Sequence, residues 1–152
     1  NAIDLFGSYI KTKDDKKIEC LNCFNYNVEE SEKRIVNDAL FLNKENNDYV
    51  IGFQNQSSIM NNLENSFFEV LVGTGANSIS KDEGIHYKNF YGTYLIGPLL
   101  VRNPKFTEEF IKKLVLSINP NFEFKPFDFE FETEAYEKYF NLHYNQKIKS
   151  TN

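Results

Sequence analysis

The chain has 152 residues, a length that fits one domain, and its 17 basic and 22 acidic residues give a net charge of −5. Hydrophobic residues make up 41% of it, which excludes wholesale disorder. The acidic balance, with no basic block, argues against nucleic-acid and membrane-surface binding, and no apolar run approaches the roughly 20 residues that span a bilayer. Two cysteines are too few for a disulfide scaffold, so a cytoplasmic location is expected.

The first two residues need separate treatment. The sequence begins Asn1-Ala2 without a methionine, and this pair is similar to the remnant of a cleaved expression tag. We therefore leave residues 1–2 out of the fold prediction as a tag remnant and expect residues 3–152 to be part of a longer protein.

Short strands are predicted over the first two thirds of the chain. Residues 5–10 are typical of the end of a helix, and a charged turn follows. Residues 17–26 alternate between apolar and polar, as a half-buried strand does. Further strands are predicted over residues 34–42, 49–53, 67–72, 85–87 and 90–96.

The last third is predicted to be helical. Asn103-Pro104 indicates a helix start, because Asn is a favoured cap and Pro costs nothing at the first helical position. Apolar residues recur at helical spacing as far as Ile118, and a second helix is predicted from Thr133. Between them, residues 122–131 form an aromatic run of period two, predicted to be an extended strand or arm that packs over a neighbouring surface.

Cys20 and Cys23 have the spacing of a redox or zinc half-site. A zinc site needs two more ligands, and the two histidines, His86 and His143, lack partner spacing. Two cysteines three positions apart in a strand also face opposite sides. We therefore expect ordinary strand cysteines, with no metal ion and no cofactor.

The remaining polar patterns have structural interpretations. Gly73-Thr74-Gly75 lacks the third glycine and the following helix of a phosphate-binding loop, so a turn is predicted. His86 and His143 have no recognisable nucleophile nearby, which favours structural roles. Composition and spacing by themselves leave an α+β domain of unassigned role.

Three motifs resemble a known family. They read Tyr49-Val50-Ile51-Gly52-Phe53-Gln54-Asn55-Gln56, then Glu83-Gly84-Ile85-His86-Tyr87-Lys88-Asn89, then Tyr91-Gly92-Thr93-Tyr94-Leu95-Ile96-Gly97-Pro98-Leu99-Leu100. In this order they resemble the C-terminal half of the cobyric-acid-synthase-like class I glutamine amidotransferases. They are most similar to the branch of small glutaminase subunits that act with Mur-ligase-like proteins in amidating the peptidoglycan precursor lipid II. The resemblance extends from about Leu5 to about Phe110.

The resemblance implies a three-layer α/β parent fold. This chain would be its C-terminal half, with a mixed, largely antiparallel sheet and two C-terminal helices. The implied partner is a Mur-ligase-like or other ATP-dependent synthetase subunit, the implied ligand is glutamine, and lipid II and cobyrinic acid are both open as the acceptor. Half of a fold would leave a sheet edge and an apolar face uncovered, so we expect the isolated chain to form a homodimer, with either this face or the aromatic arm of residues 122–131 at the contact. That face would include Val50, Ile51, Phe53, Leu95 and Leu99.

The resemblance also places the site residues. In the family, a cysteine on a strand-to-helix elbow attacks the glutamine amide and a histidine transfers the proton. The end of the elbow matches Leu5-Phe6-Gly7, so the cysteine would precede Asn1. The histidine position is Ile96, and the arginine that holds glutamine matches Arg34. In residues 53–56, an acid and an imidazole of the family are replaced by the amides of Gln54 and Gln56.

These departures leave several interpretations open. Isoleucine cannot carry a proton, and loss of a general base costs about 10²–10⁴-fold, so the chain as given is expected to be inactive. The leading hypothesis is a glutamine amidotransferase-like subunit. The alternatives are a degenerate, non-catalytic docking or binding protein and an unrelated binding module. His86 is considered as a replacement base, and Arg34 either binds a ligand or pairs with Glu29, Glu30 or Glu32 at a strand edge.

Overall fold

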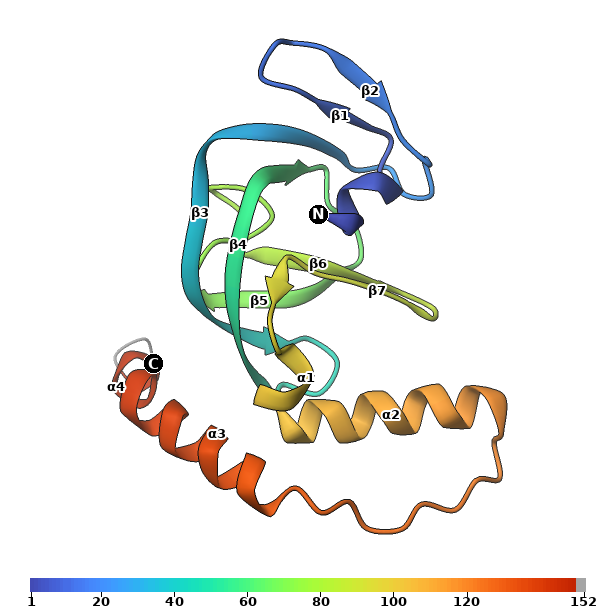
Figure 1. Cartoon of the computed structure of the whole chain (residues 1–152), viewed down its shortest axis with the longest axis vertical. Coiled ribbons are helices and arrows are strands. Elements are labelled where there is room, and N and C mark those ends of the chain that lie inside the picture. Colours follow the sequence, from blue (N-terminus) through green and yellow to red (C-terminus); the bar gives the residue numbers. More distant parts are fainter. Residues whose placement is uncertain (150–152) are drawn as a thin grey trace. The chain divides into compact units, whose positions relative to one another are not determined.

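The computed structural model describes residues 1–149, except the side chains of residues 147 and 149. The chain divides into two compact units, Asn1–Gly97 and Pro98–Asn152, which are described separately (Figure 1). The first unit holds the sheet and the second holds the long helices. In the described part of the chain, no helix is long and apolar enough to cross a membrane.

The first unit begins with a 3-10 helix, η1 (Ala2–Phe6). The strands are β1 (Tyr9–Lys11), β2 (Lys17–Glu19), β3 (Asn27–Asn43), β4 (Tyr49–Asn61), β5 (Ser66–Val72), β6 (Asp82–Tyr87), β7 (Phe90–Gly92) and β8 (Leu95–Ile96). β1 and β3 pair in parallel, whereas the other strand pairs are antiparallel. The predicted mixed, largely antiparallel sheet is therefore confirmed, as an open sheet in an α+β arrangement.

The long, curved strand β3 organises this sheet (Figure 1). It pairs with β1 near its start, with β4 along most of its length and with β5 near its end. The β3–β4 register shifts between Glu30 and Ile35, where the ladder is irregular. Along β4, alternate residues Gln54, Gln56, Ser58 and Met60 are buried, so polar side chains occupy much of the inward face of this strand.

The core of the first unit joins η1 to the sheet. Ile3 of η1 packs in one buried cluster with Val28, Met60, Ile85 and Tyr94. Ala2 is the first residue of η1, and Asn1 precedes it as the cap. Whether residues 1–2 are a tag remnant stays a prediction.

Two elements near the start differ from the predictions. The strand predicted over residues 17–26 ends at Glu19, and Cys20 and Cys23 lie in a loop. The reason is that this loop bonds to the end of η1 instead of a strand: the Leu21 N–H donates to the Leu5 carbonyl and the Cys23 N–H to the Phe6 carbonyl. The predicted helix end over residues 5–10 is wrong beyond Phe6, because the chain enters β1 at Tyr9.

The apolar face expected to be uncovered is largely buried. Val50, Ile51 and Leu95 are at most 5% exposed. Leu95 packs directly on Gly52, where an added Cβ would lie only 2.5 Å from the Leu95 side chain. The prediction of a large uncovered face at these residues is therefore wrong, because β3 and β8 flank β4 and side chains such as Leu95 fill the space.

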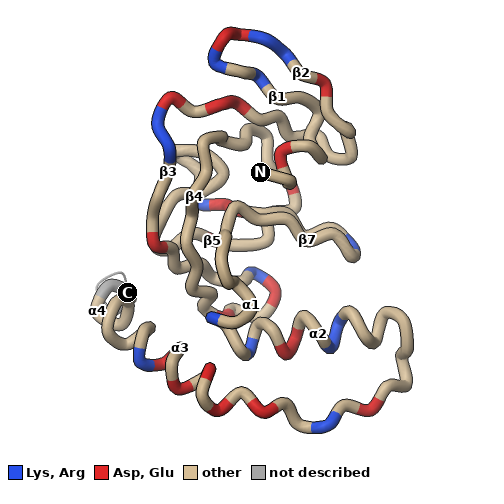
Figure 2. Tube along the Cα trace, viewed as in Figure 1, with Lys and Arg blue, Asp and Glu red and all other residues tan. Residues whose placement is uncertain are grey.

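The second unit contains α1 (Leu99–Arg102), α2 (Pro104–Ile118), α3 (Glu130–His143) and α4 (Asn145–Lys149). The two predicted helices are confirmed as α2 and α3, although α3 begins at Glu130 and two short helices accompany them. Residues 121–129 have no regular structure, and their phenyl rings contact one another in sequence. Phe122 meets Phe124 edge to face with ring centres 4.9 Å apart, and the Phe127 ring stacks with those of Phe124 and Phe129. Acidic residues are frequent from this segment into α3 (Figure 2).

Candidate functional site

The structure brings together the three motifs that carry the resemblance. The first lies in β4, the second in and after β6, and the third begins in β7 and β8. β7 pairs with β6, and β8 pairs with β4 through Phe53 opposite Ile96 and Gln54 opposite Leu95. Segments far apart in the sequence therefore form one contiguous region of the first unit.

Glu83 of β6 links the second motif to the third. Its carboxylate is fully buried and accepts a hydrogen bond from the Thr93 hydroxyl at 2.8 Å and from the Tyr94 N–H at 2.6 Å. Burial raises the pKa of Glu83 to about 7, although these two hydrogen bonds favour the charged form. Sequence analysis placed Glu83 at the start of the second motif and assigned it no role.

Gln54 fixes the turn that follows β5. Its amide donates to the Thr74 carbonyl at 2.7 Å and accepts from the Thr74 N–H at 2.9 Å. The Asn37 side chain adds a hydrogen bond to the Thr74 hydroxyl. The turn predicted at Gly73-Thr74-Gly75 is confirmed, and its positive φ of 113° explains the glycine at position 73.

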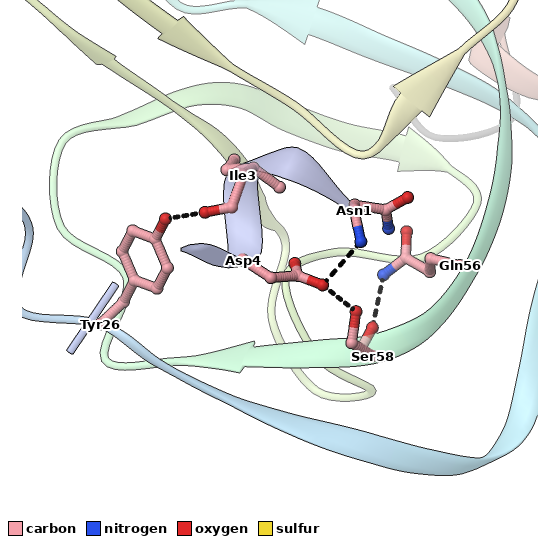
Figure 3. Close-up of polar contacts among 6 residues, drawn as sticks. All are labelled: Asn1, Ile3, Asp4, Tyr26, Gln56 and Ser58. Atoms are coloured by element: carbon pink, nitrogen blue, oxygen red, sulfur yellow. Dashed lines mark hydrogen bonds and ion pairs between the residues drawn. The ribbon is translucent and has the colours of Figure 1, made fainter. Parts of the chain in front are cut away.

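A buried polar cluster lies where η1 meets β4 (Figure 3). One carboxylate oxygen of Asp4, Oδ2, accepts hydrogen bonds from the Ser58 hydroxyl and from the amine of Asn1, each at 2.9 Å. The Gln56 amide donates to the Ser58 carbonyl at 3.0 Å. We refer to Asp4, Gln56, Ser58 and Tyr94 as the η1 polar cluster, because all four are buried and adjoin η1 or one another.

Tyr94 completes the η1 polar cluster. Its hydroxyl lies close enough to Ser58 and Asp4 to interact with both. Burial, and then the nearby Asp4 charge, raise the pKa of Tyr94. Three buried oxygens of the cluster have no hydrogen-bond partner, namely Asp4 Oδ1, Gln56 Oε1 and Tyr94 Oη.

Sequence analysis missed the central pair of this cluster. Asp4 and Ser58 are 54 positions apart, and nothing local predicts that they meet. The available signal was the period-two placement of Gln54, Gln56 and Ser58, which continues the alternation of a strand past its predicted end at Phe53.

Arg34 and Ile96 lie on the other face of β4. Partners across an antiparallel pair point to the same face, so Ile96 shares a face with Phe53, and alternation places Asn55 there too. The Arg34 guanidinium is exposed and donates through Nε to the Asn55 side chain. Among the described residues, its partner is thus Asn55 rather than one of the neighbouring glutamates. Ile96 is 37% exposed.

His86 and the two cysteines lie away from Arg34 and Ile96 in the sequence and make different contacts. His86 contacts the Glu45 carboxylate through Nδ1, faces the Lys88 carbonyl through Nε2 at 2.8 Å and stacks on Tyr91. Both ring nitrogens are thus engaged in holding β6 and its turn. Cys20 and Cys23 are free thiols, and no group of three or more potential metal-ligating side chains occurs within the described part of the chain.

Two curated proteins with the same name are similar to this chain. It is 31% identical over 129 residues to the lipid II isoglutaminyl synthase (glutamine-hydrolyzing) subunit GatD of Staphylococcus aureus strain N315, covering 85% of the chain and 53% of the relative. It is 30% identical over 105 residues to the subunit of that name from Streptococcus pneumoniae strain R6. This match covers 67% of the chain and 40% of the relative. The chain therefore spans about half the length of the curated relatives that it matches. No protein-family model matches the chain.

These similarities support a GatD-like relationship over most of the chain. The resemblance of the three motifs to small glutaminase subunits is thus confirmed as a GatD-like relationship. The relatives' names refer to lipid II, and the cobalamin-related branch of the resemblance has no support among them.

Proposed function

We propose that residues 3–152 are the C-terminal part of a class I glutamine amidotransferase-like subunit with a three-layer α/β parent fold. The subunit hydrolyses glutamine and supplies ammonia to an ATP-dependent, Mur-ligase-like partner. The observation that carries the proposal is the 31% identity over 129 residues to a subunit named as glutamine-hydrolyzing. The adjacency of the three motifs on β4, β6 and β8 supports it.

The proposed chemistry is nucleophilic. A thiolate supplied by a residue before Asn1 attacks the side-chain amide carbon of glutamine, the amide nitrogen takes up a proton and leaves as ammonia, and water releases glutamate from the thioester. Ile96 has no lone pair, so the proton must move through another group. Arg34 presents a planar guanidinium to solvent beside β4, which suits bidentate binding of the glutamine α-carboxylate.

The names of the relatives favour lipid II over cobyrinic acid as the acceptor of the ammonia. We therefore place the partner in peptidoglycan amidation. The 152-residue chain studied alone is proposed to release no ammonia, because its cysteines, Cys20 and Cys23, lie in a loop rather than on an elbow.

The test is ammonia release from glutamine by the protein extended to the length of its relatives, with and without the partner and ATP. Ammonia release by the extended protein, with none from residues 1–152, is the expected result. An extended protein that binds the partner and releases no ammonia would contradict the proposal and favour a degenerate docking protein.

A further inference from the structure

A small cavity lies beside the C-terminal end of η1. It has a volume of about 210 Å³ and is lined by residues 23–26, by the β4–β5 loop and by β6. The Cys23 and Phe24 N–H groups both donate to the carbonyl of Phe6, the last residue of η1, whereas Asn1 caps the other end of this helix. The cavity and the first residue of the chain are therefore at different ends of η1.

Three aromatic rings form two walls of this cavity. The Phe24 ring is nearly parallel to the Tyr26 ring, at 15°, and nearly perpendicular to the Tyr87 ring, at 84°, with centres 6.2 Å apart in both pairs. The Tyr26 hydroxyl already donates to the Ile3 carbonyl, so the ring is the part of this side chain left for a ligand. The face of an aromatic ring carries negative potential, and walls at a right angle let one cation contact both.

Glu64 supplies the charge of the cavity. It is the one Asp, Glu, Lys, Arg or His among the lining residues, and its carboxylate has no ion pair or hydrogen bond within the described part of the chain. The carboxamides of Asn25 and Asn65 are exposed and add acceptors for N–H groups. The Lys88 ammonium, outside the lining residues, lies 5.2 Å from the centre of the Tyr87 ring, so this ring already attracts a cation. An acid beside aromatic faces favours a cation over an anion.

The size of the cavity limits the ligand. Pockets for drug-sized molecules measure about 300–1,000 Å³, so a cavity of about 210 Å³ accepts a smaller group. A metal ion is a poor match, because no group of three or more potential metal-ligating side chains occurs among the residues that the structure describes. A short alkyl chain that carries an ammonium group matches both the apolar walls and the single acid.

We propose that this cavity is a binding site for a small alkylammonium ion, with its charge beside Glu64 and its carbons against Phe24 and Tyr87. A free amine and a lysine side chain of a peptide both offer this chemistry. The inference goes beyond the proposed function and does not rest on it, because the proposed glutamine chemistry uses none of these three residues.

The test is an NMR titration of the backbone amides of the chain with n-butylammonium chloride. The controls are 1-butanol, which has the same carbon chain without the charge, and sodium chloride at equal ionic strength. We expect saturable shifts at residues 23–26, 64–65 and 85–87, and about tenfold weaker binding of 1-butanol. Equal affinities for the amine and the alcohol, or shifts confined to other residues, would overturn the proposal.

Two variants separate the charge from the rings. Glu64→Gln keeps the shape of the side chain and should weaken butylammonium binding about tenfold, with 1-butanol binding unchanged. Asp14→Asn, which neutralises an exposed acid outside the cavity, should change neither. Tyr87→Leu keeps an apolar side chain without a ring and should weaken the amine selectively. Unchanged butylammonium binding in either cavity variant would count against the site.

Two further titrations identify the source of the amine and the state of the cavity in a longer chain. Nα-acetyl-lysine amide binding more tightly than butylammonium would support a peptide side chain as the ligand, and the reverse order would support a free amine. The protein extended to the length of its relatives should bind butylammonium as the 152-residue chain does. Loss of binding in the extended protein would overturn the proposal, because other residues would then fill the cavity. Glutamine hydrolysis is measured separately, so the two proposals fail independently.

Discussion

Glu83 gives the first unit a pH-dependent stability. Its pKa is about 7 in the folded chain against 4.5 for an ordinary glutamate, so the folded state binds the proton more tightly than the unfolded state. The stabilisation by this proton is complete below pH 4.5 and is lost as the pH rises through 7, a change of about 3 kcal/mol in the free energy of unfolding. Urea unfolding at pH 5 and pH 8 measures this change in the free energy of unfolding. Glu83→Gln should remove this difference, and the exposed Glu64→Gln should retain it.

Arg34→Ala should weaken glutamine binding if the extended protein binds this amino acid. Loss of a charged hydrogen bond to the α-carboxylate corresponds to about 1.5–3 kcal/mol. Calorimetry on the two proteins checks it, with Lys33→Ala as the matched loss of a neighbouring exposed cation. Equal affinities would leave Arg34 as a surface residue that contacts Asn55.

Ile96→His should raise glutaminase activity of the extended protein. Ile96 is partly exposed at the end of β8, so an imidazole fits there with little effect on folding. A general base at this position is worth about 10²–10⁴-fold in rate. The measurement is the rate of ammonia release by the histidine variant. The control is Ile96→Leu, which changes the shape of the side chain and adds no base. A histidine variant no faster than the leucine variant would show that the proton is handled elsewhere.

The contact of β8 with β4 depends on Gly52 having no side chain, because Leu95 packs against its Cα. An added Cβ would meet Leu95 at 2.5 Å, so Gly52→Ala overpacks the site and should destabilise the first unit by about 1–3 kcal/mol. Leu95→Ala alone should also destabilise, because it leaves a cavity. The double variant should be more stable than the sum of the two predicts, since each relieves the other. Additive losses in thermal unfolding would mean that β8 moves away instead.

Local patterns predicted the existence of most elements, and tertiary contacts set their ends. β4 was predicted to stop at Phe53, but it continues to Asn61 because its polar residues find partners inward, such as Thr74 for Gln54 and Asp4 for Ser58. The cysteine loop was predicted as a strand because the alternation there gives no sign of its bonds to η1. Pattern matching supplied Arg34 and Ile96, but no sequence pattern could place Asp4 beside Ser58.

The isolated chain is expected to form a homodimer through exposed apolar residues of its helical unit. The sheet face first suggested is buried, but Phe131 and Leu142 remain about 80% exposed on α3. They are eleven positions apart, which is close to three helical turns, so they lie on one side of that helix. Light scattering coupled to size exclusion should give twice the chain mass, and Phe131→Ser should shift it toward the monomer. A monomer at micromolar concentration for the unmodified chain would contradict the expectation.

Two backbone amides of the first unit each donate a hydrogen bond to a buried side chain, but only one of these side chains titrates. The Thr74 N–H donates to the Gln54 side chain, and the Tyr94 N–H donates to the Glu83 side chain. The first acceptor is neutral at every pH, whereas the second loses its proton near pH 7 at a cost to the folded state. As the pH rises, the sheet should therefore loosen first from its β6–β8 side while the turn at Thr74 stays closed. Hydrogen exchange at these two amides would follow this loosening, with Thr74 as the built-in reference.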